Sequence, residues 1–345
     1  MWLKHSLESG KVESTITRHS QSHVFNAVLT IQRISIVSHS FRLLTYARDN
    51  KPVGAVFMNN QVFDLADVLP ETPTVLDVLN DWENTQKELA ALAKDATRLA
   101  KFTGRSLDTV TYLPPVLYPN GIYCAGANYT DHLAEMSKAF NLPAEPDPHE
   151  IGMPPWLFIR TARNTMVGHG GRVTIPAYSK QFDWELEVAV VIGRQCKDVA
   201  EADAMDYVAG YTIINDLSAR DFMKRPKATP GSAMEYDWIS QKNFDGACPT
   251  GPWIVPRDDI ANPLDLDLKL WVNDTLMQDS NTSKMIFNYA ELVSFLSQRL
   301  TLYPGDIVAT GTPAGVGMPR GIFLQKGDKV SIAVESIGEL TTTLI

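Results

Sequence analysis

Cysteine, basic charge and long apolar runs are all scarce in this sequence, and each scarcity argues against a class of protein. The three cysteines, Cys124, Cys196 and Cys248, lie far apart and form no Cys-x-x-Cys pair. A disulfide framework or a thiolate zinc site is therefore not expected, and a reducing cytoplasm is the predicted location. No apolar run approaches the roughly 18 residues that a membrane-spanning helix needs, so no membrane association is predicted.

Basic residues are outnumbered by acidic ones, 31 against 40, which gives a formal net charge of -9 and a pI of about 5.3. This balance argues against nucleic acid or an anionic membrane surface as the main partner. The Gly-x-Ser-x-Gly elbow of serine hydrolases and the His-Glu-x-x-His pair of zinc proteases are also missing. We therefore expect neither of those chemistries.

Composition divides the chain into three parts. Residues 1–40 are rich in Ser and Thr and hold four of the seven histidines, without metal-ligand spacing or a clean apolar signal segment. We predict a loosely attached extension there, with an organelle presequence as the alternative. Residues 41–112 are predicted to form a small α+β domain, and a Pro-rich break leads to a main domain at 117–345.

The small domain shows two local signals. Asn59-Asn60 separates two strand-like runs and indicates a tight hairpin, while residues 84–102 have the spacing of one surface helix. The main domain has many strands of uneven spacing and few helices, one of them expected at 289–300 with Asn288 as its cap. This pattern predicts a β-rich α+β roll in preference to an alternating parallel sheet.

Glu185 and Glu187 stand at the start of a short apolar run that is typical of a buried strand. Side chains two apart on a strand share a face, so the two carboxylates are expected to lie together. Burying like charges unpaired is costly, and carboxylate oxygens suit Mg²⁺, Mn²⁺ or Ca²⁺. The alternative is a solvated edge strand whose wet face is acidic.

Asp216 ends a later strand and is a candidate third ligand. Three carboxylates would leave coordination positions for water or substrate oxygens, which is how magnesium is usually held. The competing interpretation is that Asp216 only caps the next turn, a frequent role of aspartate.

Three further features could carry chemistry. His132 and Glu135 are three apart on a predicted helix, so the carboxylate could orient the imidazole as a general base; an ordinary surface pair is the alternative. Lys242 could stabilise an oxyanion, or be a surface lysine. The turn at 310–317, with Thr312, could hold a substrate carboxylate with its amides and hydroxyls, or be purely structural.

Taken together and in this order, six segments resemble the fumarylacetoacetate hydrolase family across residues 118–345. The segments are residues 126–132, 183–187, 210–221, 242–245, 251–253 and 310–317. Residues 41–112 are similar to the smaller N-terminal domain that many members carry. The resemblance implies a mixed β-roll, a homodimer, and one Mg²⁺ or Mn²⁺ ion per active site.

The resemblance also implies roles for individual residues. Glu185, Glu187 and Asp216 match the metal ligands, His132 and Glu135 the water-activating dyad, and Lys242 the oxyanion lysine. Arg220, Thr312, Arg160 and Arg163 are candidates for binding the substrate.

Two departures from the family pattern bear on the substrate. The family's hydrolase prototype has an aspartate as a further metal ligand near the position of Asn128. The side chain of Asn128 could offer the metal only a carbonyl oxygen. Many relatives have Lys in place of Arg160, and Arg163 adds a second cation nearby, which could favour an acidic substrate.

From these features we predict a metal-dependent hydrolase that cleaves a carbon–carbon bond of a 1,3-diketo acid, an acylpyruvate-like keto acid, through a metal-bound enolate. The first alternative is an isomerase, tautomerase or decarboxylase of 2-oxo acids in aromatic catabolism. The second is a binding protein that has kept the fold and lost turnover.

Overall fold

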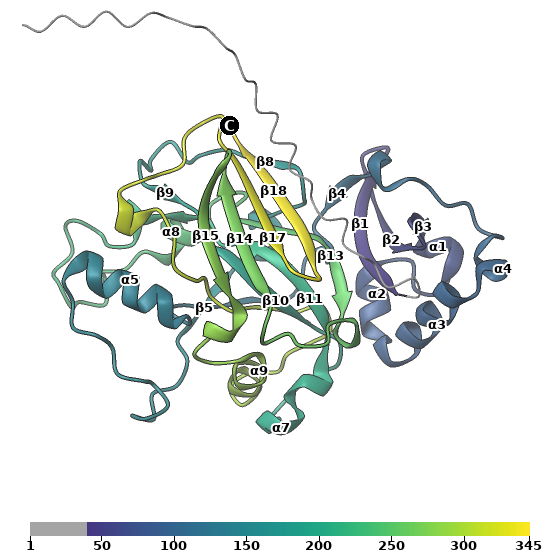
Figure 1. The fold of residues 1–345 in the computed structure, drawn as a ribbon, viewed down its shortest axis with the longest axis horizontal. Coiled ribbons are helices and arrows are strands. Elements are labelled where there is room, and N and C mark those ends of the chain that lie inside the picture. The colour runs from purple at the N-terminus through teal and green to yellow at the C-terminus, as the bar shows by residue number, and fades with distance from the viewer. Residues whose placement is uncertain (1–39) are drawn as a thin grey trace, which may run out of the picture. The chain divides into compact units, whose positions relative to one another are not determined.

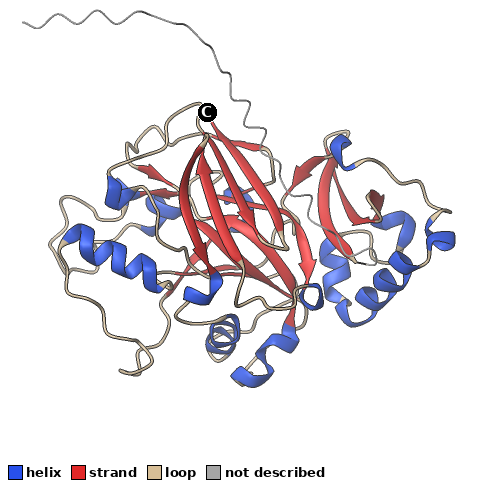
Figure 2. Cartoon of the chain, in the orientation of Figure 1, coloured by secondary structure: helices blue, strands red, loops and turns tan. Residues whose placement is uncertain are grey.

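The computed structural model describes residues 40–345, and Figures 1 and 2 show their helices and strands. Strands dominate, which confirms the β-rich α+β class that the sequence predicts. The extension predicted for residues 1–40 lies outside the described residues apart from Ser40. Within residues 40–345, the structure contains no helix whose length and apolar character would let it cross a membrane.

The larger sheet has eleven strands, most of them antiparallel to their neighbours. Its order is β3 (Gln61–Asp64), β2 (Lys51–Met58), β1 (Phe41–Arg48), β13 (Cys248–Pro256), β11 (Val208–Asn215), β10 (Leu186–Ile192), β16 (Ile307–Ala309), β5 (Ile122–Ala125) and β6 (Leu157–Arg160). Two short strands, β4 (Thr111–Leu113) and β7 (Met166–Val167), pair with β1 and β13.

A second sheet of five strands lies beside the centre of the larger one (Figure 1). Its order is β15 (Thr275–Asn281), β14 (Asp267–Val272), β17 (Lys329–Val334), β18 (Gly338–Leu344) and β8 (Gly171–Val173). A two-stranded ribbon joins β9 (Phe182–Asp183) to β12 (Ser218–Ala219).

The helices are short, and most lie at the edges of the sheets (Figure 2). They are α1 (Leu65–Val68), α2 (Val75–Asn80), α3 (Trp82–Lys94), α4 (Ala96–Leu99), α5 (Thr130–Phe140), α6 (Ala162–Thr165), α7 (Glu201–Ala204), α8 (Trp238–Lys242) and α9 (Tyr289–Ser297).

Strand β10 is buried along its whole length, and its alternate residues enter two different cores. Val188 and Val190 belong to the core shared with the five-stranded sheet, and Ala189 and Val191 to the core that α2 and α3 cover. Burial on both faces explains why this strand reads as a continuous apolar run, since neither face has to meet water. The charged Glu187 within it therefore needs a specific explanation.

The small N-terminal unit is continuous with the larger sheet. Strand β1 pairs with β2 on one side and with β13 on the other, with Leu43 opposite Ile254. Asn59 and Asn60 turn the β2–β3 hairpin with φ of 48° and 62°, the left-handed values that a two-residue hairpin favours. The hairpin prediction is confirmed, and the division into domains at 41–112 and 117–345 stays a prediction.

The helix expected at residues 84–102 is interrupted. Helix α3 ends at Lys94. The side chain of Asp95 then caps the start of α4 by accepting a hydrogen bond of 2.9 Å from the backbone N–H of Arg98. Aspartate competes for backbone donors in this way, so a cap overrides the helical spacing of the surrounding alanines and leucines. Asn288, in contrast, caps α9 as the sequence predicts.

We predict that Gly210→Ala destabilises the protein, because a Cβ at this position of β11 would lie 2.1 Å from the carbonyl oxygen of Val255 on β13. Backbone cannot yield as a flexible side chain can, and overpacking of this kind costs about 1–3 kcal/mol or more. Urea unfolding measures the change in the free energy of unfolding. Thr275→Ala on the exposed start of β15 is the control, and equal stability of both variants would contradict the prediction.

Candidate active site and metal centre

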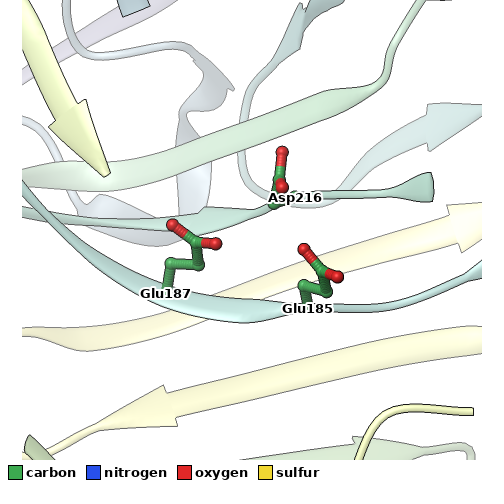
Figure 3. A group of neighbouring side chains, drawn as sticks. All are labelled: Glu185, Glu187 and Asp216. Carbon is green, nitrogen blue, oxygen red and sulfur yellow. The ribbon is translucent and has the colours of Figure 1, made fainter. Parts of the chain in front are cut away.

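Three carboxylates meet where β10 begins and β11 ends (Figure 3). The two strands are antiparallel, with Leu186 opposite Asn215, so Glu185 and Asp216 become neighbours and the backbone N–H of Asp216 donates to the carbonyl of Glu185 at 2.8 Å. Glu187 projects from the second position of β10. One oxygen of each carboxylate lies within 4.8 Å of the others, and all three side chains are buried.

Three buried cations surround this triad. The ammonium of Lys242 donates to Glu185 at 2.8 Å and also to Asp216. Arg160 forms an ion pair with Asp216, and Arg220 forms one with Glu185 and another with Asp183 at 2.9 Å. Most of the acidic charge is therefore neutralised locally, which offsets the cost of burying it.

The charges act differently on the carboxylates. Burial favours the protonated form of Glu185, but the charges of Arg220 and Lys242 outweigh it and lower its pKa well below the usual value. Burial raises the pKa of Glu187 well above the usual value, and the neighbouring Asp216 and Glu185 raise it further. A hydrogen bond from the Gly311 N–H at 3.0 Å is the contact found for Glu187 in the described chain.

Glu187 is thus the carboxylate whose negative charge the surrounding groups compensate least. A divalent cation among the three carboxylates would supply the missing charge, and an all-oxygen donor set suits Mg²⁺, Mn²⁺ or Ca²⁺. The residues present therefore fit a divalent metal ion. Asn128 is otherwise engaged, because its side chain bonds to the backbone of Phe287 and Thr310.

Two polar residues that sequence reasoning left without a role support the site. Asp183 accepts hydrogen bonds from the backbone N–H groups of Gly317 at 2.7 Å and Met318 at 3.0 Å, besides its ion pair with Arg220. Gln278 accepts from Leu186 N–H at 3.0 Å. Asp183 could have been found from the sequence, because it is two residues before Glu185 and so shares its face.

The turn at residues 310–317 is built into the site by its backbone. Gly311 and Gly315 have φ of 87° and 108°, and the Gly311 N–H is the donor to Glu187. Thr312 is buried, and its hydroxyl oxygen accepts a hydrogen bond of 2.8 Å from Gln278. That bond leaves the hydroxyl hydrogen of Thr312 available for donation.

Helix α5 is attached to the same turn through its acidic residues. Asp131 accepts from Ala314 N–H at 3.2 Å, and Glu135 accepts from Gly315 N–H at 2.8 Å and from the Arg320 guanidinium at 3.3 Å. No residue of α5 is fully buried. The helix thus rests on the turn mainly through polar contacts.

His132 on α5 is half-buried. Its Nδ1 atom is buried and has no hydrogen-bond partner among the described residues, and its pKa is lowered because burial disfavours the imidazolium. The bonds of Glu135 run to Gly315 and Arg320, and no His132–Glu135 hydrogen bond is present within the described chain. The dyad that the sequence predicts is therefore close in sequence but not paired in this structure.

The two candidate arginines near β6 lie in different surroundings. Arg160 is fully buried against Asp216, whereas the Arg163 guanidinium lies 4.9 Å from the centre of the Tyr118 ring. Arg163 lines a separate cavity of about 410 Å³ together with Lys51 and Pro114. The structure thus brings Arg160 and Arg220 to the triad and places Arg163 beside another cavity.

Residues 121–345 match the family described as fumarylacetoacetate (FAA) hydrolase, C-terminal. The match covers more than half of the chain, and the chain belongs to this family. The names of similar proteins include hydrolases, isomerases and tautomerases, so the family identifies an enzyme class without a single reaction.

Two curated relatives and one solved structure illustrate this range. The mitochondrial oxaloacetate tautomerase FAHD2B of Homo sapiens is 37% identical over 68% of this chain and 70% of its own length. The 2,4-didehydro-3-deoxy-L-rhamnonate hydrolase of Sphingomonas sp. (strain SKA58) is 36% identical over 84% of this chain and 91% of its own.

The solved structure is the maleylpyruvate hydrolase of Sphingobium sp. SYK-6, in complex with manganese (II) ion and pyruvate. It has a TM-score of 0.67 and 26% identity, and the alignment covers 88% of this chain and 98% of that chain. A bound manganese in a relative agrees with the acidic triad of this chain as a divalent metal site. Because the human relative is named as mitochondrial, a cytoplasmic location stays a prediction.

We predict that Glu187→Gln weakens Mn²⁺ binding at least about a hundredfold, since losing residues that merely orient metal ligands already costs about 10–100-fold. Because the pKa of Glu187 is raised in the metal-free protein, metal binding should also release a proton from it where it is protonated, and affinity should rise with pH. Calorimetry in two buffers of different ionisation enthalpy measures both effects.

The matched control is Glu83→Gln, which changes an exposed glutamate in the same way. Unchanged Mn²⁺ affinity and unchanged proton release in Glu187→Gln would show that this carboxylate is not a ligand.

Proposed function

We propose that this chain is a metal-dependent hydrolase that cleaves the carbon–carbon bond of an acylpyruvate-like 1,3-diketo acid. The observation that carries the proposal is the triad of Glu185, Glu187 and Asp216, whose oxygens converge within 4.8 Å, together with the half-buried His132, whose pKa is lowered by burial. These carboxylates would hold Mg²⁺, Mn²⁺ or Ca²⁺. When bound, such an ion supplies Lewis-acid polarisation of the keto-acid oxygens.

The chain's own residues would carry the proton and charge movements. The neutral imidazole of His132 takes a proton from water, and the resulting hydroxide adds to the distal carbonyl carbon. The Lys242 ammonium stabilises the oxyanion that forms there. As the bond to the central carbon breaks, its electron pair passes into the enolate of the departing 2-oxo acid, which then regains a proton.

The remaining candidates have different parts in this proposal. Thr312 has a hydroxyl hydrogen available for a substrate carboxylate, which supports a binding role. Arg160 and Arg220 are each engaged by a carboxylate of the site, so we assign them the positioning of Asp216 and Glu185. Arg163 lies beside a separate cavity, and substrate contact by it stays a prediction.

A second candidate function is a tautomerase or decarboxylase of 2-oxo acids. The specific observation in its favour is that Glu135 is bonded to Gly315 and Arg320 and not to His132, so the water-activating dyad is not assembled. Tautomerisation moves a proton between carbon and oxygen and needs no attacking water. The name of the human relative, an oxaloacetate tautomerase, supports the same alternative.

A substrate panel separates the two candidates. The protein is incubated with acylpyruvates and with oxaloacetate, with and without Mg²⁺ or Mn²⁺, and the products are identified by mass in water labelled with heavy oxygen. Two fragments, one of which carries a labelled oxygen at its new carboxyl group, support hydrolysis. Loss of carbon dioxide, or an unchanged mass with altered enol absorbance, supports the second candidate.

We predict that His132→Ala and Lys242→Ala each lower kcat at least about a hundredfold. A positioned general base contributes about 10²–10⁴-fold and one oxyanion donor about 10²–10³-fold. Steady-state kinetics measures the loss, and calorimetry checks that His132→Ala still binds Mn²⁺.

The controls are His149→Ala and Lys269→Ala, which change exposed residues paired with Glu291 and Asp279. A variant of His132 or Lys242 that turns over at the parent rate would remove that residue from the mechanism.

A further inference from the structure

A cluster of four aromatic side chains lies next to the proposed oxyanion lysine. The members, which we call the aromatic wall, are Trp156, Phe158, Tyr236 and Trp238. The Trp238 ring is central: its centroid lies 5.1 Å from Trp156, 5.4 Å from Phe158 and 6.2 Å from Tyr236. Residues from β6, α8 and the segment before each thus form one continuous surface.

The aromatic wall contacts the site at two points. At one end, the Lys242 ammonium lies 5.3 Å from the centre of the Phe158 ring, and Trp238 begins the short helix that Lys242 ends. At the other end, the Trp156 indole covers Gly126, where a Cβ would lie 2.1 Å from a ring carbon. Gly126 directly follows β5, so the wall runs from the oxyanion lysine to the start of the segment that leads into helix α5.

The wall is accessible. Trp156 keeps 50% of its surface exposed and Tyr236 keeps 46%, although both stack on neighbouring rings. Large aromatic surface left open beside catalytic groups is typical of a ligand subsite, where apolar side chains form most of the lining and a few polar groups orient the ligand. The wall therefore offers a binding surface for the part of a substrate beyond its reacting carbonyl.

The charges around the wall indicate which class of substrate it can bind. Three cations lie over its rings, Arg160 and Lys242 over Phe158 and Lys224 over Tyr236. Each is already bonded to a carboxylate: Arg160 to Asp216, Lys242 to Glu185 and Asp216, and Lys224 to Glu235. A second substrate carboxylate placed against these rings would lose hydration, and Arg160 and Lys224 are already paired with protein carboxylates, so its binding would be costly.

We propose that the aromatic wall receives the distal end of the substrate and that the enzyme prefers monocarboxylic diketo acids with an aryl or other apolar acyl group over dicarboxylic ones. The inference rests on the proposed function, because it names the substrate class of the same site. It makes Trp156, the most exposed ring of the wall, a specificity-determining residue.

The test compares benzoylpyruvate with succinylpyruvate, which differ in having a phenyl group or a second carboxylate at the distal end. The parent enzyme should have the higher kcat/KM for benzoylpyruvate. Trp156→Ala should lower the ratio of the two kcat/KM values at least about tenfold, mainly through KM for benzoylpyruvate, since binding pockets discriminate apolar groups by about 10–200-fold. Trp156→Arg should lower the ratio further by adding a cation for the diacid.

Trp156→Leu keeps apolar bulk and should lie between parent and Trp156→Ala, which guards against a variant that fails to fold. Tyr303→Ala removes another half-exposed aromatic ring outside the wall and is the matched control. A parent preference for succinylpyruvate, or an unchanged ratio in all three Trp156 variants, would overturn the inference. So would a Trp156→Ala variant that keeps the ratio but changes its mass in light scattering, because the wall would then be covered by a second copy of the chain.

Binding of non-hydrolysable 2-oxo acids separates this inference from the proposed function. Calorimetry with Mg²⁺ present should show phenylpyruvate binding more tightly than 2-oxoglutarate, with Trp156→Ala weakening only the former. If no diketo acid is turned over but this binding pattern holds, the hydrolase proposal fails and the subsite stands. If diketo acids are hydrolysed and the pattern is absent, the subsite inference fails alone.

Discussion

The antiparallel pairing of β10 with β11 is the interaction on which the site depends. It sets Glu185 at the start of one strand beside Asp216 at the end of the other, joined by a backbone hydrogen bond of 2.8 Å. A slip of the register by one residue would turn Glu187 to the opposite face and into the core shared with the five-stranded sheet. The extensive burial of both strands disfavours such a slip, so the core that stabilises the fold also positions the carboxylates.

Several carboxylates buried in a core repel one another and lose hydration, so the surrounding structure has to compensate their negative charge. Arg160, Arg220 and Lys242 compensate part of this charge, and each comes from a different segment of the chain. Backbone N–H groups compensate another part of the charge. One of them belongs to Gly311, whose positive φ lets its N–H donate to Glu187. Glu187 remains the least compensated, so a divalent cation would complete the arrangement electrostatically as well as chemically.

Local features of the sequence predicted local structure well. The i, i+2 spacing identified the paired glutamates, and the asparagines at 59–60 and 288 marked a hairpin and a helix cap. Long-range contacts were harder to predict from the sequence. Nothing near Gln278 in the sequence indicates that it would bond Leu186, 92 residues away, because the packing of the five-stranded sheet against the larger one brings them together. The family resemblance supplied roles for residues such as Lys242, for which spacing gave no prediction.

Relatives of this chain are named as hydrolases and as tautomerases, so family membership cannot by itself select the reaction. Selection has to come from groups that approach the substrate from other sides. Helix α5 carries His132 and is held through Glu135, whose carboxylate accepts hydrogen bonds from Gly315 and Arg320 and not from His132. In the functions that we propose, His132 on this helix would determine whether water is activated, whereas the aromatic wall would determine which distal group is accepted. Reaction and substrate would then be controlled by separate elements around one candidate metal site.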